Sequence, residues 1–433
     1  MLALVPLLLL ARAVQADRRP LLAGFGWGLL AGLAFFGPLL TWIARFGVVP
    51  WILLSLILAV FVGVFVAGVA AWGTRPWRSA AAVVLWVALE AVRSSFPLGG
   101  FPWGVLGYTQ HDGGPLLGVA RTLGVLGVSA AAAAIAAGVE SLLVHLVGSG
   151  APKRVRAAAP AAAGVALMLG GSFALSASPP PSSGGSIDIA AVQGYDEELP
   201  PLSQARDDQT RIEQVTRRMV EASRELGDGA QRPELTVWPE NALDADVRTN
   251  QTMRRFVDEA LELVDSPLLA GGQLFDAETD TLRTAMILFE EPSAPGEAYV
   301  KRRLIPFGEY VPLRRWVDWY PALRHLPRDA TPGDIPGVFD VGGAVVGPIA
   351  CFESIFPEIV HDQVRAGAQV LVVSTNTSSY GRTAASRQHL AFSQLRAVET
   401  GRWIMHTGIS GISGVVDPEG RVTHQTELYE RAI

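Results

Sequence analysis

Long apolar runs follow one another through the first 180 residues of the chain. Most of them reach the roughly 20 residues that an α-helix needs to cross the hydrocarbon layer of a bilayer. The shorter run 1–14 is expected to be part of a further span. Five such runs in succession are not typical of a large soluble protein, so we predict a multi-helix transmembrane domain over residues 1–177. The predicted spans lie near residues 21–44, 49–73, 79–95, 115–147 and 155–177.

The loops between these runs differ in their content of Lys and Arg. Short loops that are rich in these residues stay on the cytoplasmic side of a membrane. Five crossings that begin on this side at residue 19 would place residue 178 outside. We therefore predict a multi-pass membrane protein with an extracytoplasmic C-terminal half. Three alternate loops are basic, holding Arg12, Arg18 and Arg19, then Arg75 and Arg78, then Lys153, Arg154 and Arg156, whereas the intervening loops hold only Arg45 and Arg93.

The composition changes sharply near residue 180. Residues 1–180 contain 11 Lys and Arg against 4 Asp and Glu, whereas residues 181–433 contain 24 against 37. Residues 178–186 are rich in Pro, Ser and Gly, which is typical of a linker. No basic patch with interleaved aromatic residues is present, so the sequence indicates no nucleic-acid partner. We predict a second domain over residues 187–433.

The second half alternates short apolar strands with longer helices, which favours an α/β domain built of sheet and helix layers. Its apolar runs are short and often β-branched, whereas its helical segments are charged and amphipathic. The expected strands are 187–192, 235–238, 344–350, 370–374, 402–406 and 412–416, and the expected helices are 205–226, 355–366 and 386–400.

Cys351 is the only cysteine, so no disulfide can form within the chain. It lies between the expected strand 344–350 and the expected helix 355–366. A nucleophile at such a turn is exposed, and the backbone N–H groups that follow it can face a developing oxyanion. A thiol must lose its proton before it attacks. A lone cysteine is also often a small buried hydrophobe, so its position alone leaves both interpretations open.

Two further segments supply charged groups that a cysteine nucleophile would need. The segment Val237-Trp238-Pro239-Glu240 places a carboxylate at the end of an expected strand, and residues 299–312 contain Lys301 and Glu309. A carboxylate can act as a base where burial raises its pKa, and an ammonium stabilises a tetrahedral oxyanion. The sequence has no CxxC or HExxH pattern, so it indicates no metal site, and it indicates no cofactor.

In this order, Glu240, Lys301 and Cys351 resemble the Glu–Lys–Cys set of the carbon–nitrogen hydrolase (nitrilase) superfamily. The chain is more similar still to its membrane branch, the apolipoprotein N-acyltransferase family of actinobacteria, and the resemblance covers almost the whole chain. The segments that carry it are Leu85-Trp86 with Glu90, Gly100-Phe101-Pro102-Trp103, Gly107-Tyr108-Thr109-Gln110, Val192-Gln193-Gly194, Trp238-Pro239-Glu240, residues 307–312, Cys351 with Glu353, and Gln388-His389 ahead of residues 396–399.

The resemblance implies an αββα nitrilase-like sandwich on a helical transmembrane domain, and a location in the bacterial inner (cytoplasmic) membrane. It implies that Glu240 is the general base, that Lys301 binds the oxyanion with the backbone N–H of Phe352, and that Cys351 becomes acylated. Glu309 and Glu353 match acidic positions that support the site. The implied acyl donor is a phospholipid, typically phosphatidylethanolamine, and the implied acceptor is the N-terminal α-amine of S-diacylglyceryl cysteine in a lipoprotein.

The sequence departs from the family pattern in several places. Phe352 stands where many members have Tyr, residues 376–381 replace a more aromatic loop, and residues 407–411 replace an Asn-rich turn. These differences concern substrate preference more than the reaction. Compared with the family, the chain lacks a first membrane helix, the closing strands and a last membrane helix, so we expect its catalytic domain to be C-terminally incomplete.

Two other functions remain open on the sequence. The same three residues would serve a membrane-tethered amidase or nitrilase that hydrolyses C–N bonds with water as acceptor. The second alternative is a non-catalytic membrane scaffold, since in some actinobacteria similar domains accompany a polyprenol-phosphate mannosyltransferase.

Residues 311–326 combine aromatic side chains with arginines and follow Lys301 and Glu309 closely. Trp suits the headgroup level of a membrane, and Arg can bind phosphates. The segment also fits an ordinary packed helix-turn, but we favour a mobile arm that lies at the membrane interface and opens the path to Cys351. The lipid-facing residues of this predicted arm are Arg314, Arg315, Trp316 and Trp319.

Overall fold

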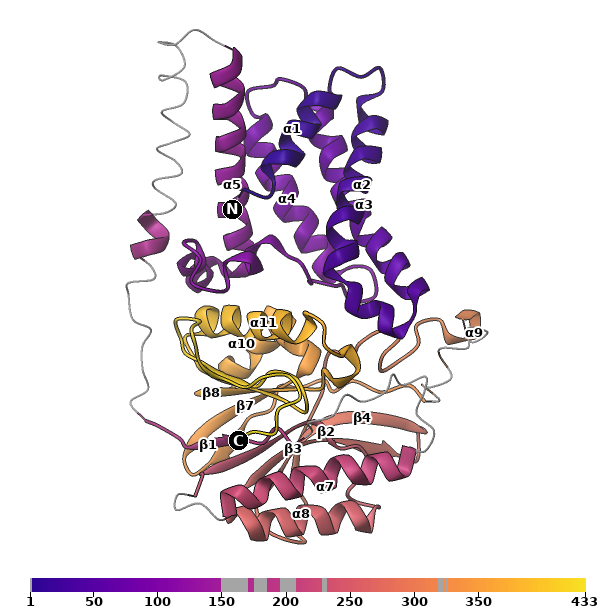
Figure 1. Cartoon of the computed structure of the whole chain (residues 1–433), viewed down its shortest axis with the longest axis vertical. Helices are drawn as coiled ribbons and strands as arrows, with labels where there is room; N and C mark the ends of the chain where they lie inside the picture. The colour runs from indigo at the N-terminus through magenta and orange to yellow at the C-terminus, as the bar shows by residue number, and fades with distance from the viewer. Residues whose placement is uncertain are drawn as a thin grey trace. The chain divides into compact units, whose positions relative to one another are not determined.

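The computed structural model of the chain divides into two compact units, Met1–Pro179 and Pro180–Ile433 (Figure 1). The structure describes residues 2–148, 170–174, 185–194, 208–227, 232–317, 323, 326 and 328–433. Of the predicted linker, only residues 185 and 186 lie within these ranges. The first unit is helical, and the second contains two β-sheets with helices.

The first unit is built from helices rich in Ala, Leu, Val and Gly. Its α-helices are α1 (Val5–Val14), α2 (Pro20–Leu39), α3 (Val48–Ala71), α4 (Arg78–Ser95) and α5 (Ala120–Gly148), and its short 3-10 helices are η1 (Thr41–Phe46), η2 (Leu106–Gln110) and η3 (Leu117–Val119). Within the described part of the chain, three helical segments are long and apolar enough to cross a membrane. They are Pro20–Leu39, Val48–Ala71 and Leu117–Val144.

These three segments overlap the predicted spans near residues 21–44, 49–73 and 115–147. The predicted span near residues 79–95 forms helix α4, which carries three charged residues and is not among the three. The predicted span at 155–177 lies outside the described residues, apart from residues 170–174, which are helical. The number of membrane crossings therefore stays a prediction.

Helices α2 and α3 approach each other closely along a stripe of small residues. Gly24, Gly28 and Gly32 recur at every fourth position of α2 and lie against α3. A Cβ atom added at Gly28 would lie 2.7 Å from the carbonyl oxygen of Val62, so only glycine allows this distance between the backbones. Small residues at helix contacts are a common means of packing membrane helices.

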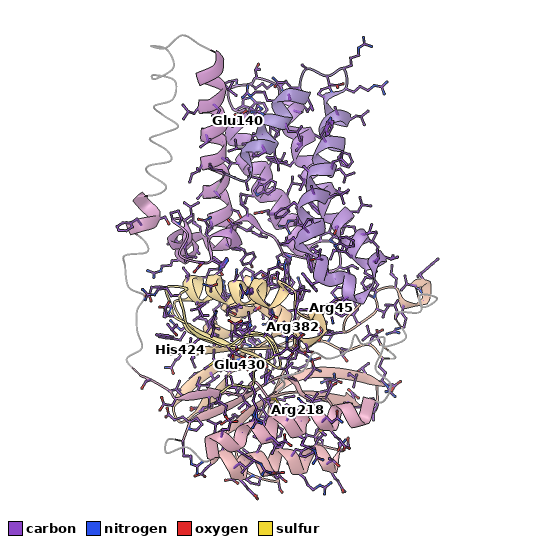
Figure 2. The ribbon with its side chains drawn as sticks, viewed as in Figure 1. Arg45, Glu140, Arg218, Arg382, His424 and Glu430 are labelled. Carbon is purple, nitrogen blue, oxygen red and sulfur yellow. The ribbon has the colours of Figure 1, made fainter. Side chains whose placement is uncertain are left out.

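A buried cluster of charged side chains joins three helices of the first unit. Glu140 of α5, labelled in Figure 2, accepts hydrogen bonds from Arg12 Nε of α1 at 2.7 Å and from Arg78 Nη1 of α4 at 3.1 Å. Arg78 also donates to the carbonyl oxygen of Leu8 at 3.0 Å. Glu140 and Arg78 are both buried. Removal of one partner would leave an uncompensated buried charge, so the cluster fixes α1 against α4 and α5.

Two buried residues of α4 organise the loop that follows this helix. Arg93 Nη1 donates to the carbonyl oxygens of Phe101 and Trp103 at 3.0 and 2.8 Å. Glu90 Oε1 accepts the backbone N–H of Leu106 at 2.7 Å. The segments around Glu90 and residues 100–110, which carried the family resemblance in this half, therefore form one hydrogen-bonded structure.

The second unit contains a five-stranded and a six-stranded sheet. The first has the order β1-β2-β3-β4-β5. Strands β1, β2 and β3 are parallel to one another, and β4 is antiparallel to both of its neighbours, β3 and β5. The second has the order β11-β10-β9-β8-β7-β6, with β7, β8 and β9 parallel. The strands are β1 (Ile189–Ala191), β2 (Leu235–Leu243), β3 (Leu268–Asp276), β4 (Thr281–Phe289), β5 (Glu297–Val300), β6 (Phe339–Val341), β7 (Ala344–Ala350), β8 (Val370–Thr375), β9 (Trp403–Gly408), β10 (Gly414–Val416) and β11 (Val422–Gln425).

Three successive apolar cores show that this unit has four layers (Figure 1). One core joins α7 (Asp208–Gly227) and α8 (Gln251–Val264) to the first sheet. The second lies between the sheets, where Val237 and Met286 share a cluster with Val346 and Val372. The third joins the second sheet to α10 (Pro357–Arg365) and α11 (Ala385–Thr400). The predicted αββα sandwich is thereby confirmed.

Gln193, which also carried the family resemblance, joins the first strand region of the second unit to residues 413–432. Its backbone pairs with Ala432, and its side-chain amide donates to the carbonyl oxygens of Glu427 and Glu430 at 2.9 Å each. Its side-chain oxygen accepts a hydrogen bond from Ser413 Oγ at 2.6 Å. The residue thus ties the start of this unit to segments more than 200 positions later in the chain.

Candidate active site

Cys351 lies on a strained turn at the end of strand β7, in the second sheet. Strand β7 ends at Ala350, and the 3-10 helix η6 (Cys351–Ile355) begins directly after it. Cys351 has a φ of +47°, a left-handed conformation that is costly for a residue with a Cβ atom. Cys351 is only 2% exposed, so the expectation of an exposed nucleophile at this turn was wrong. The predicted order of strand, cysteine and helix is present, with a single 3-10 turn and then α10 after the cysteine.

Lys301 follows β5 and points its ammonium at two carboxylates. Its Nζ lies 2.9 Å from Glu240 Oε1 and 3.0 Å from Glu309 Oε1. Its backbone N–H bonds to the carbonyl oxygen of Thr284 at 2.8 Å, which fixes the start of the side chain. Lys301 is 1% exposed, so water contributes almost nothing to the solvation of this charge. The two carboxylates replace that solvation.

Glu240 lies in the second half of β2, where the pairing with β3 becomes irregular. Strand β3 passes very close to it, because a Cβ atom added at Gly271 would lie 2.5 Å from Glu240 Cα. The Glu240 carboxylate accepts a hydrogen bond from Lys301 Nζ and also interacts with the thiol of Cys351. One carboxylate thus contacts both the cation and the sulfur.

Burial dominates the proton affinities in this group. It raises the pKa of Glu240, against the opposing effect of the Lys301 charge. Burial and the charge of Glu240 raise the pKa of Cys351 well above its usual range. Burial acts to lower the pKa of Lys301, but Glu240 and Glu309 outweigh it and raise that pKa well above its usual value. The resting site therefore holds a thiol, and Glu240 is a stronger base than an exposed glutamate.

Glu309 and Glu353, the two supporting carboxylates of the prediction, have different surroundings. Glu309 accepts hydrogen bonds from Lys301 Nζ, from Thr284 Oγ1 at 3.1 Å and from the backbone N–H of Ile305 at 2.8 Å. It therefore holds the ammonium and its loop together. Glu309 belongs to the same cluster as Glu240 and Lys301.

Glu353 is bound by backbone groups from both sides of the site. It accepts N–H groups of Arg302 at 2.6 Å, of Arg303 at 3.1 Å and of Ala350 at 2.9 Å. The hydroxyl of Tyr299 donates to both of its oxygens at 3.0 Å. Glu353 thus fixes the segment after Lys301 to the turn before Cys351. The side chain of Phe352 packs edge-on against Phe356, with ring centroids 5.2 Å apart.

The structure adds residues to the site that the sequence did not assign. The backbone N–H of Asn376 faces the Cys351 sulfur, and its side-chain amide donates to Asn241 Oδ1 at 3.2 Å. Tyr380 is buried, and burial together with the nearby charge of Glu240 raises its pKa well above the usual value. Asn376 and Tyr380 come from the loop that departs from the family pattern. His389 Nε2 lies 3.1 Å from the carbonyl oxygen of Cys351.

The residues of the predicted lipid-facing arm are described only in part. Arg314 and Trp316 lie in the single turn α9 (Arg314–Val317). Arg314 Nη2 pairs with Asp329 Oδ1 at 2.5 Å, whereas Arg315 is exposed and the Trp316 side chain is 70% exposed. Trp319 lies outside the described residues, so its placement stays a prediction.

The described ranges contain no group of three or more His, Cys, Asp or Glu side chains that could hold a metal ion. Near Cys351, the ammonium of Lys301 pairs with the carboxylates of both Glu240 and Glu309. What the arrangement offers chemically is therefore a thiol, a carboxylate base and a fixed positive charge.

Comparison with known proteins extends over both units. Residues 1–138 match the apolipoprotein N-acyltransferase N-terminal domain, and residues 189–433 match the carbon-nitrogen hydrolase family. The chain is 34% identical to the apolipoprotein N-acyltransferase of Mycolicibacterium smegmatis, over 94% of this chain and 71% of that protein. It is 27% identical to that of Geobacter metallireducens, over 100% of this chain and 83% of that protein.

A solved structure of an amidase from Nesterenkonia sp. is also similar to the chain. It is 18% identical, covers 57% of this chain and 89% of the amidase, and superposes with a TM-score of 0.42.

Proposed function

The chain belongs to the apolipoprotein N-acyltransferase family, and from this premise we propose that Cys351, Glu240 and Lys301 carry its reaction. The protein is a membrane acyltransferase of lipoprotein maturation, and its acceptor is a lipoprotein. The observation that carries the residue assignment is the buried contact of the Glu240 carboxylate with both Lys301 Nζ and the Cys351 thiol.

In the first half-reaction, Glu240 takes the proton of the Cys351 thiol as the sulfur attacks the ester carbonyl of a phospholipid. The carbonyl oxygen becomes an oxyanion, which the Lys301 ammonium and the backbone N–H of Phe352 stabilise. Glu240 and Glu309 engage two of the three ammonium hydrogens, which leaves one for the oxyanion. Collapse breaks the ester C–O bond, Glu240 protonates the departing lysophospholipid oxygen, and the acyl group remains on sulfur as a thioester.

In the second half-reaction, the α-amine of the S-diacylglyceryl cysteine attacks the thioester. Glu240 accepts the amine proton, and the same donors stabilise the second oxyanion. Collapse breaks the C–S bond, the sulfur regains a proton from Glu240, and the product is an amide. One carboxylate thus acts as base and then as acid in both half-reactions, which suits a group whose pKa burial has raised.

The phospholipid donor is supported by the family and by exposed apolar side chains that follow Lys301 in the chain. Phe307, Leu313 and Trp316 are all exposed large hydrophobic residues. Arg315 beside them is exposed and can meet a phosphate. We assign residues 311–326, with Arg314, Arg315, Trp316 and Trp319, to a lipid-facing arm of an extracytoplasmic catalytic domain.

The two alternatives differ in what they would do with the acyl group. An amidase or nitrilase would pass it to water, and a scaffold would form no acyl-enzyme at all. The comparisons give no support to an association with a polyprenol-phosphate mannosyltransferase. The complete set of Glu240, Lys301 and Cys351 in one buried cluster favours an active enzyme over a scaffold.

The proposed function is tested by following one labelled acyl chain. The full chain is reconstituted with a phospholipid whose acyl chains are isotopically labelled, and intact-mass spectrometry is used to detect the adduct. We expect a labelled adduct on Cys351 that disappears when a diacylglyceryl lipopeptide is added, with the label then in an amide of that lipopeptide. Release of free labelled fatty acid at the same rate with and without lipopeptide would instead identify a hydrolase.

A further inference from the structure

Helix α11 brings His389 against the backbone of the Cys351 turn. His389 Nε2 lies 3.1 Å from the carbonyl oxygen of Cys351 and 3.1 Å from Ser354 Oγ. We assign the ring hydrogen to Nε2, because a carbonyl oxygen only accepts hydrogen bonds and this tautomer lets Nε2 donate to it. His389 therefore contacts the backbone of the proposed nucleophile, whereas Glu240 contacts its sulfur.

The surroundings of His389 hold its ring in one orientation. The ring is buried and packs edge-on against His406, with centroids 5.5 Å apart and planes at 89°. It packs in the same way against Phe392, at 5.8 Å. His406 is itself fixed, because its Nδ1 bonds to Ser393 Oγ at 2.8 Å. Burial lowers the pKa of His389 to about 4, so the ring is neutral at pH 7 and is poorly suited to be the base for Cys351.

The hydrogen bond from His389 determines more than the position of one oxygen. The carbonyl of Cys351 and the N–H of Phe352 belong to the same peptide group, which is planar and trans, so they point in opposite directions. A donor that fixes the carbonyl therefore fixes the direction of the N–H. Cys351 has a φ of +47°, a conformation that a cysteine does not prefer, so a hydrogen bond to its carbonyl helps to stabilise the turn.

We propose that His389 is a positioning residue, which holds the carbonyl of Cys351 and thereby directs the N–H of Phe352 at the oxyanion of both half-reactions. The inference rests on the proposed function, because it takes Cys351 as the nucleophile. No proton moves to or from His389 in either step. Its contribution is the orientation of a backbone donor before the reaction begins.

Two reactions of the same cysteine separate this role from a general effect on the fold. Acylation by a phospholipid passes through an oxyanion, whereas alkylation by iodoacetamide is a displacement at a CH₂ group and forms none. Both require the thiol to lose its proton. The full chain in micelles is compared with His389→Phe, which keeps a ring but has no donor, and with His389→Gln, whose amide can donate from a similar position. His424→Phe on the exposed strand β11 is the matched control.

We expect His389→Phe to lower the single-turnover acylation rate at saturating phospholipid by about 100-fold or more, the usual loss for one oxyanion donor. The apparent KM for phospholipid and the alkylation rate should change only a few-fold. His389→Gln should recover about tenfold or more of the lost rate, and His424→Phe should match the parent. The proposal is overturned if His389→Phe acylates normally, if both rates fall together, or if His389→Gln alkylates normally but recovers no acylation.

Failure of the proposed function gives a different pattern. An acyl adduct that forms on Cys351→Ser, or a Glu240→Gln variant with unchanged alkylation and acylation, would refute the assignment of the nucleophile or the base. Neither result depends on His389. A loss confined to the acylation of His389→Phe would support both the proposed function and the positioning role.

Discussion

Lys301 Nζ and Glu240 Oε1 lie 2.9 Å apart, and both side chains are almost completely withdrawn from solvent. An isolated pair in such surroundings is costly, because the attraction rarely repays the desolvation of two charges. Here Glu309 provides a second partner for the ammonium, and the Cys351 thiol provides a second partner for the Glu240 carboxylate. Two carboxylates share one ammonium, so Lys301 keeps a charged partner in Glu309 when Glu240 accepts a proton.

The first prediction concerns the nucleophile. Cys351→Ser should leave the fold nearly intact, because the two side chains are similar in size, but it should abolish the acyl-enzyme. A serine hydroxyl is far harder to deprotonate than a thiol, and the surroundings of Cys351 already raise the pKa of the group that they hold. Intact-mass spectrometry after incubation with labelled phospholipid measures the adduct. Normal lipoprotein acylation by this variant would exclude the thioester mechanism.

The second prediction concerns the base and the cation. Glu240→Gln and Lys301→Ala should each lower the single-turnover rate of thioester formation by about 100-fold or more, the usual scale for loss of a base or an oxyanion donor. Lys301→Ala also leaves Glu240 and Glu309 without their shared cation, so its melting temperature must be measured alongside. Glu259→Gln on the surface of α8 is a control that should not change the rate. A near-normal rate in either variant would mean that its residue is misassigned.

The third prediction concerns pH. Glu240 must be deprotonated to act, and its pKa is raised, so the acylation rate should fall as the pH decreases through a value above that of an exposed glutamate. The charge of Glu309 contributes to this increase. Glu309→Gln removes that charge, so it should shift the acid limb of the pH–rate profile to lower pH. A shift to higher pH, or none, would show that Glu240 is not the group that titrates.

Six of the eleven strands in the described part of the second unit were predicted from the sequence, because they are apolar and well bounded, whereas β3, β4, β5, β6 and β11 were not predicted. Strand β7 has the limits that the sequence predicted, since Gly342 and Gly343 precede it with positive φ and Cys351 ends it in the same way. Helix α8 was not among the predicted elements, although Asn250 caps it through the N–H groups of Thr252 and Met253. Its apolar positions also recur at helical spacing.

The different roles of the Glu309 and Glu353 carboxylates could not be predicted from the sequence. Glu309 and Glu353 are both single acidic residues in apolar segments, and nothing in the sequence says that one binds an ammonium and the other three backbone N–H groups. The role of Glu353 depends on the ends of β5 and β7, which belong to different sheets and which this carboxylate joins. The position of Asn376 near Cys351 could have been predicted, because the two residues follow β8 and β7. These strands are parallel, so their carboxyl ends meet at one edge of the sheet.

The fourth prediction concerns topology. A reporter fused after Ser183 should report an extracytoplasmic location, and one inserted at residues 148–152 should report a cytoplasmic one. The reason is the excess of Lys and Arg in alternate loops of the first unit. Paired alkaline phosphatase and green fluorescent protein fusions measure both sites in the same cells. A cytoplasmic result after Ser183 would invert the orientation and separate Cys351 from lipoproteins on the outer side.

The last prediction concerns how the lipid donor reaches Cys351. Trp316 and Leu313 are each 70% exposed, whereas Arg314 is held by Asp329, so the described part of the arm is anchored on one side and apolar on the other. Burial of an exposed Trp in a lipid interface is favourable. A water-soluble acyl donor provides no lipid interface in which the Trp side chain could be buried.

The double variant Trp316→Ala and Trp319→Ala should therefore slow acylation by vesicle or micelle phospholipid much more than acylation by a short, water-soluble thioester. Trp403→Ala, on an exposed side chain at the start of β9, is the matched control and should affect neither donor. Equal slowing with both donors would mean that the arm only supports the fold around Lys301. In that case, access to Cys351 would have to be controlled by another segment.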